Sequence, residues 1–139
     1  MDLIQFKSFI KSESAKAEEA LQQAHTALAM KDSAKLTDAV CACIQHKFLL
    51  EELPTVQDDL LKLSEESTVR TLKLAEGNLQ AADVSSGCVE ADTADTKKIL
   101  LLLMLKKRFA LDLSPEEMAD IDTVGDVCRR MSLEMNFPS

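Results

Sequence analysis

The chain carries apolar residues at helical spacing over most of its length, and residues that break helices are few. Among 139 residues there are three glycines and three prolines. Residues 2–30 contain neither, and apolar side chains recur there every three or four positions, which is the spacing of one face of an α-helix. Strands favour aromatic and β-branched residues and need turn glycines, yet the chain has no Trp, no Tyr and five Phe. The sequence therefore predicts an all-α fold.

The first two predicted helices form a hairpin. They cover residues 2–30 and about 33–52, and a short polar break that contains Asp32 and Ser33 separates them. Either of these two residues can cap the second helix, and so short a connection makes the helices antiparallel neighbours. We predict that this hairpin, residues 1–53, is an N-terminal extension. Its apolar stripe must be covered, either by the rest of the chain or by a second copy in a homodimer.

Four further helices are predicted in residues 54–139. Pro54 stops the second helix, and Thr55 is expected to cap the third. The fourth contains the run ILLLLML and is so apolar that we expect it to lie centrally in the core. Ser114-Pro115-Glu116-Glu117 is a strong start signal for a short fifth helix. The predicted ranges are 56–76, 96–109, 115–121 and from 122 to just before Pro138.

Charge and hydropathy exclude two classes of partner. The formal net charge is −8, and residues 1–96 hold nine Lys/Arg against seventeen Asp/Glu, whereas residues 97–139 hold seven of each. An acidic chain without a basic tail is a poor ligand for nucleic acid, because phosphate neutralisation supplies most of that affinity. The longest apolar run, residues 99–105, is far shorter than the roughly 20 residues that span a bilayer. We expect no nucleic-acid partner and no membrane span.

The residues that usually carry chemistry are scattered. Neither the cysteines nor the two histidines have the spacing of metal ligands, and no catalytic triad pattern or glycine-rich phosphate loop occurs. We therefore expect no metal and no enzymatic activity. The N-terminal segment lacks the features of a secretory signal, which predicts free thiols in the cytoplasm or another reducing intracellular compartment. The cysteines are Cys41, Cys43, Cys88 and Cys128, and the histidines are His25 and His46.

The block KKRFALDLSPEEMADIDTVGDVCRRM, residues 106–131, has an ordered set of features. Phe109, Leu113 and Ile121 frame the Ser-Pro-Glu-Glu start, and the segment Thr-Val-Gly-Asp at 123–126 opens the last helix. This pattern resembles the C-terminal half of acyl carrier proteins, the phosphopantetheine-binding carriers. The resemblance covers these residues well and extends more weakly upstream to Val56.

The resemblance implies an acyl-carrier-protein-like four-helix bundle over residues 54–139, preceded by a hairpin that a stand-alone carrier lacks. In the family, a serine at the start of the second bundle helix carries 4′-phosphopantetheine. Counting back from Phe109 without a gap puts Asp95 at that position, and a carboxylate cannot be phosphopantetheinylated. The resemblance thus implies a degenerate attachment position and no cofactor. The alternative is a genuine acyl or peptidyl carrier that is modified at a nearby hydroxyl, namely Ser86, Thr93 or Thr96.

The same helix departs from the family in its charge. It is acidic in carrier proteins, whereas here it carries a basic cluster of five residues and no acid. Since complementary charge steers association, the cluster is expected to meet an acidic protein partner or the chain's own acidic N-terminal half, unless it is only a solvated face. The basic cluster consists of Lys97, Lys98, Lys106, Lys107 and Arg108.

These observations predict a non-catalytic, carrier-protein-like module that is not phosphopantetheinylated and acts through protein–protein interaction. Two alternatives stay open. One is the genuine carrier with 4′-phosphopantetheine, and the other is a helical adaptor subunit of a larger assembly without any carrier role.

Overall fold

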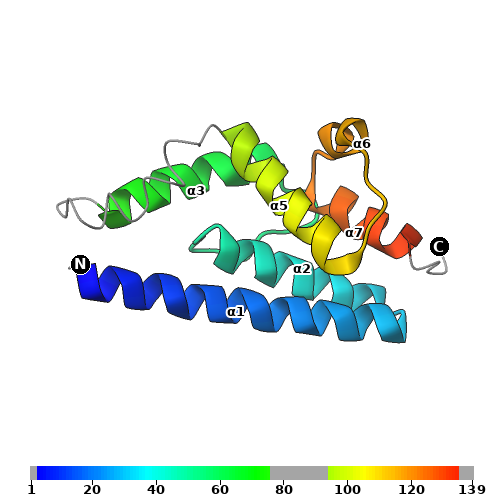
Figure 1. The fold of residues 1–139 in the computed structure, drawn as a ribbon, viewed down its shortest axis with the longest axis horizontal. Helices are drawn as coiled ribbons and strands as arrows, with labels where there is room; N and C mark the ends of the chain where they lie inside the picture. Colours follow the sequence, from blue (N-terminus) through cyan, green and yellow to red (C-terminus); the bar gives the residue numbers. More distant parts are fainter. Residues whose placement is uncertain (1–2, 76–93, 135–139) are drawn as a thin grey trace.

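The computed structural model describes residues 3–75 and 94–134, and every regular element in these ranges is a helix (Figure 1). The prediction of an all-α fold is therefore confirmed for the described part of the chain. The carrier-type arrangement of the last four helices stays a prediction. The elements are α1 (Leu3–Met30), α2 (Ser33–Lys47), α3 (Leu60–Ala75), α5 (Ala94–Phe109), α6 (Pro115–Asp120) and α7 (Val124–Glu134).

Helices α1 and α2 form the predicted antiparallel hairpin, and they run side by side along one edge of the molecule (Figure 1). Asp32 caps α2, because its carboxylate accepts a hydrogen bond of 3.1 Å from the backbone N–H of Lys35. The second helix is shorter than predicted and ends at Lys47 rather than near residue 52. Leu49 then adopts a positive φ of 58°, and the N–H of Leu50 closes the helix end on the carbonyl of Gln45.

The start predicted for the third helix is wrong. Helix α3 begins at Leu60, and its cap is Asp59, whose Oδ1 accepts hydrogen bonds from the N–H groups of Leu61 and Lys62 at 2.8 and 3.2 Å. Thr55 instead donates its N–H to the carboxylate of Asp58 in the turn before the helix.

A cross-chain pairing explains why the helix starts late. Residues 56–60 lie antiparallel to the segment before α7, with a bridge between Asp59 and Thr123. The N–H of Leu60 donates to Asp122, and the N–H of Gly125 donates to Val56 at 2.9 Å. A Cβ atom at Gly125 would lie 3.0 Å from the carbonyl oxygen of Val56, so this close approach favours glycine. Backbone groups used in this pairing are not available for a helix.

The predicted start of α6 is confirmed in detail. Ser114 accepts from the N–H of Glu117, and the Glu117 carboxylate accepts from the N–H of Ser114, which is a complete capping box. Helix α7 has a similar reciprocal arrangement between Thr123 and Asp126, at 3.1 Å in both directions.

One hydrophobic core connects the hairpin to the later helices. It includes Leu36 and Ile44 of α2, Leu105 of α5 and Met131 of α7, all fully buried. Helix α2 packs against α7, and α3 packs against α5. The stripe of the hairpin is thus covered by the rest of the same chain, while the division of the chain at residue 53 stays a prediction.

The expectation that the fourth predicted helix lies centrally holds for one of its faces. Leu101, Leu102 and Leu105 of α5 are buried, whereas Leu100 and Leu103 are exposed. Among the described helices, none is both long enough and apolar enough to cross a membrane.

Candidate functional site

The position that the resemblance assigns to the attachment serine lies in the first turn of α5. This helix begins at Ala94, so Asp95 is its second residue and Thr96 its third. The first N–H groups of a helix have no partner within the helix, and the positive end of its dipole favours a carboxylate at this point. Thr96 is half-buried. The alternative hydroxyls Ser86 and Thr93 lie outside the described residues, as does Cys88.

Three lysines of the basic cluster contact other parts of the same chain. Lys97 donates from Nζ to Oγ of Ser67 on α3 at 2.9 Å. The Nζ atom of Lys98 is 3.9 Å from a carboxylate oxygen of Asp122, and its side chain is largely buried. Lys106 donates from Nζ to the carbonyl oxygen of Leu113 at 2.5 Å. These three amino groups fasten α5 to its neighbours.

Arg108 joins α5 to the acidic N-terminal half, which was one of the two roles expected for the basic cluster. Its guanidinium donates two hydrogen bonds to the carboxylate of Glu18 on α1, one of them 2.9 Å long. This bidentate contact lowers the pKa of the Glu18 carboxyl and raises the pKa of Arg108. Next to it, the rings of His25 and Phe109 lie with their centroids 4.3 Å apart.

Lys107 is exposed, as Arg108 is, and it lies on the outer face of α5. Leu100 and Leu103 precede it at spacings of seven and four residues, so the three side chains share one stripe of the helix. We call Leu100, Leu103 and Lys107 the α5 ridge. A hollow of about 680 Å³ adjoins the ridge and is lined by Leu103, Lys106, Lys107, Ala110, Leu111 and Asp112. The α5 ridge offers apolar contact and one cation to a ligand.

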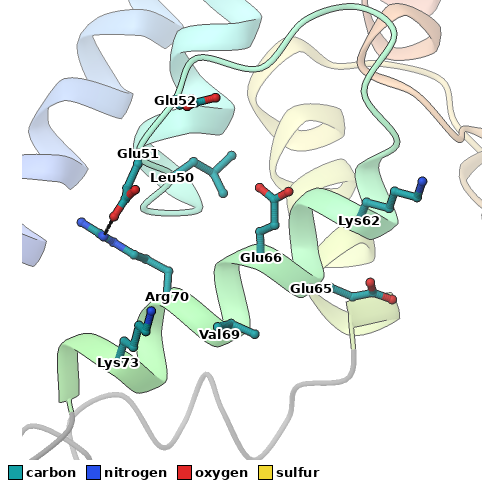
Figure 2. A pocket seen from close by; sticks show the side chains of 9 residues that line it. All are labelled: Leu50, Glu51, Glu52, Lys62, Glu65, Glu66, Val69, Arg70 and Lys73. Atoms are coloured by element: carbon teal, nitrogen blue, oxygen red, sulfur yellow. Dashed lines mark hydrogen bonds and ion pairs between the residues drawn. The ribbon is translucent and has the colours of Figure 1, made fainter.

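A groove of about 600 Å³, which the sequence did not predict, lies between α3 and the turn after α2. Figure 2 shows Arg70 of α3 reaching across to Glu51, with which it forms an ion pair. Glu66 also points from α3 toward Leu50 of the turn (Figure 2), and Val69 lines the same groove. The sequence held one signal for it: the apolar residues of α3 are too numerous for a single face.

The described cysteines and His46 contribute to packing and to contacts between helices. Cys41, Cys43 and Cys128 are buried and free, and burial raises the pKa of Cys43 and of Cys128 to about 11. Such thiols stay protonated at neutral pH, which makes them poor nucleophiles. His46 of α2 lies 2.5 Å from a carboxylate oxygen of Glu13 on α1 and joins the two hairpin helices. Within residues 3–75 and 94–134, no group of three or more His, Cys, Asp or Glu could hold a metal ion.

Comparison with known proteins gives no relative for this chain. No family model matches it, and neither a curated protein nor a solved structure does so.

Proposed function

We propose that this chain is a non-catalytic, carrier-protein-like helical module that carries no phosphopantetheine and works by binding another protein. The observation that carries the proposal is Asp95, the second residue of α5, at the position where the resemblance expects the modified serine. A carboxylate there suits the helix dipole but cannot accept the arm.

The order of the helices supports the carrier part of the proposal. From α3 onward the chain has a long helix, the stretch between the described ranges, a second long helix, one of six residues and one of eleven. This is the order that the resemblance implies. Two groups of contacts, from Arg108 to Glu18 and from α2 to α7, attach the hairpin to it.

The α5 ridge supports the proposal that the chain binds another protein. Two exposed leucines and one exposed lysine on adjacent turns form a surface suited to a segment with apolar side chains and a carboxylate. Of the basic cluster, Lys107 is the residue best placed for an external partner, because Lys98, Lys106 and Arg108 already contact groups of this chain. The proposed partner is therefore an acidic protein.

Intact mass tests the first part of the proposal. The chain is coexpressed with a phosphopantetheinyl transferase, with an authentic acyl carrier protein as the positive control. We expect the control to gain the arm and this chain to keep its unmodified mass. A mass increase of one arm that peptide mapping assigns to Ser86, Thr93 or Thr96 would establish the genuine carrier instead.

Association kinetics test the second part. The partner is captured from the native source, and its binding is compared for the native chain, Lys107→Glu and the control Lys35→Glu, which reverses an exposed charge on α2. We expect Lys107→Glu to slow association several-fold at low salt and much less at high salt, because exposed charges act mainly on the encounter rate. Equal slowing by Lys35→Glu would mean that only net charge matters, and the α5 ridge would not be the docking surface.

A further inference from the structure

Helix α3 buries several small polar side chains and exposes several large apolar ones, although Leu60 and Leu63 at its start are buried. Its buried face toward α5 carries Ser64, Ser67 and Thr71, which are 0%, 1% and 5% exposed. Its outer face carries Leu61, Val69 and Leu72, which are 36%, 59% and 51% exposed. A surface helix normally buries its large apolar residues and exposes its polar ones.

The buried hydroxyl groups are satisfied, so the orientation of α3 is consistent with good packing. Ser64 and Thr71 each donate to the carbonyl oxygen four residues earlier in the helix, at 2.8 Å in both cases. Ser67 accepts from Nζ of Lys97 on α5. Small side chains let the two helices approach closely, and no buried hydroxyl here is left without a partner.

The ends of α3 hold the helix in this orientation. Leu60 and Leu63 at its start are buried in the main core. Leu74 near its end packs against Phe6 of α1, together with neighbouring apolar residues of that helix. The apolar outer face is therefore a fixed surface of the described fold.

This outer face continues into the groove of Figure 2. Val69 belongs to both, and Leu50 supplies a second apolar side chain across the groove. The groove also holds four carboxylates and three cationic side chains, and one pair of these, Glu51 and Arg70, is joined in an ion pair. Three carboxylates and two ammonium groups remain outside this ion pair. The carboxylates belong to Glu52, Glu65 and Glu66, and the ammonium groups belong to Lys62 and Lys73.

We propose that the outer face of α3 and the adjoining groove form a docking surface for a basic amphipathic helix of a partner protein. The exposed residues Leu61, Val69 and Leu72 extend over three turns of α3, a length that a second helix lying alongside can cover. The three carboxylates left by the Glu51–Arg70 pair outnumber the two ammonium groups by one, which favours positive charge on that helix. The net charge of −8 attracts a basic segment over a longer range.

This surface is separate from the α5 ridge and has the opposite charge preference. The module would then hold two partners, one acidic at α5 and one basic at α3. The inference does not depend on the state of Asp95, because α3 and the groove keep their chemistry whether or not the chain is modified.

Binding of two designed peptides tests the inference. Both are fluorescent amphipathic helices of about 18 residues, one built from Leu and Lys and the other from Leu and Glu in the same pattern. We expect the Leu/Lys peptide to bind the native chain and the Leu/Glu peptide to bind at least about tenfold more weakly, as measured by fluorescence anisotropy.

Three double variants locate the binding. The variant Val69→Ser/Leu72→Ser should weaken the Leu/Lys peptide at least about tenfold, and Glu65→Gln/Glu66→Gln should weaken it and reduce its salt dependence. The control Leu100→Ser/Leu103→Ser removes two exposed leucines from α5 and should leave binding unchanged. Thermal melting of each variant checks that the fold is preserved, and we expect these exposed substitutions to leave the melting temperature nearly unchanged.

Several outcomes would overturn the inference. These are no binding of the Leu/Lys peptide, equal binding of the Leu/Glu peptide, or equal weakening by the α5 control. Sedimentation that shows a dimer of the native chain, abolished by Val69→Ser/Leu72→Ser, would identify a second copy as the occupant, and the proposal of a basic partner helix would be wrong.

Discussion

At the scale of single residues, caps and ion pairs decide where helices end and which charges remain for a partner. Within residues 3–75 and 94–134, three helices are followed, one or two residues after their last residue, by a non-glycine residue with positive φ, and the next N–H donates the hydrogen bond that closes the helix C-terminus. The left-handed conformation costs such residues roughly 1–2 kcal/mol, so tertiary contacts must hold these ends in place. The three are Lys31, Leu49 and Ala110.

Asp126 gives a pH-dependent prediction at this scale. Hydrogen bonds from the N–H groups of Asp122 and Thr123 lower the pKa of its carboxyl below the usual value of 3.8. The charged form is thus favoured in the folded state, and its contribution is present above pH 3.8 and lost as the pH falls through the lowered pKa. We expect Asp126→Ala to reduce the free energy of unfolding by about 1 kcal/mol near neutral pH, as for the loss of a helix cap.

Urea denaturation at several pH values measures this effect. The difference between the native chain and Asp126→Ala should shrink as the pH falls below 3.8. The control Asp120→Ala removes a nearby exposed carboxylate and should change stability little. A difference for Asp126→Ala that stays constant down to strong acid would show that its charge has no part in holding the start of α7.

At the scale of elements, α3 and α5 show that a helix with a buried apolar face can also expose large apolar residues on its other side. Each presents large apolar residues to solvent, and the interface between them contains hydroxyl groups and the amino group of Lys97. Stability should therefore depend strongly on position within α3. We expect Leu63→Ala, at a buried position, to cost about 2–5 kcal/mol, because it leaves a cavity in the core.

By contrast, Leu72→Ser on the outer face of the same helix should change stability by less than about 1 kcal/mol, since its side chain is already half in water. Chemical denaturation of both variants gives the comparison. A large loss for Leu72→Ser would mean that its side chain is covered in solution, for instance by a second copy of the chain.

At the scale of the whole molecule, the hairpin and the later helices share one core. Leu36, Val40 and Ile44 of α2 are buried in the same cluster as Val127 and Met131 of α7. Removing residues 1–53 would expose these apolar surfaces of α7 and α5 to water, at roughly 25 cal/mol for each square ångström. We expect the fragment 54–139 to melt at a clearly lower temperature than the full chain and to bind a hydrophobic dye.

Calorimetry and dye fluorescence of the fragment and of the full chain make this comparison. The variant Glu18→Gln in the full chain is the matched control, because it removes the ion pair with Arg108 and leaves the core intact. An unchanged melting temperature in the fragment, with no dye binding, would show that residues 54–139 fold independently of the hairpin.

The sequence by itself determined the helices and several of their ends. A cap at Asp32 or Ser33, the Ser114–Glu117 capping box and the start of the last helix near Thr123 were readable because each is a local interaction among residues a few positions apart. The all-α class followed from periodicity and from the scarcity of breakers. Counting along the chain put Asp95 just before a helix predicted from Thr96, whereas α5 begins at Ala94 and includes Asp95.

Only the tertiary structure decided which face of each helix is buried and which cationic side chains contact other groups of the chain. The late start of α3 comes from the pairing of residues 56–60 with 122–125, which local signals at Thr55 could not reveal. The contact of Arg108 with Glu18 joins positions 90 residues apart. The face of α3 that points outward is likewise set by a distant contact, the hydrogen bond that Lys97 of α5 donates to Ser67 of α3. Local interactions involve residues a few positions apart, so the sequence alone predicts them. Burial depends on which distant segments of the chain pack together, and hydrophobic periodicity does not specify these segments.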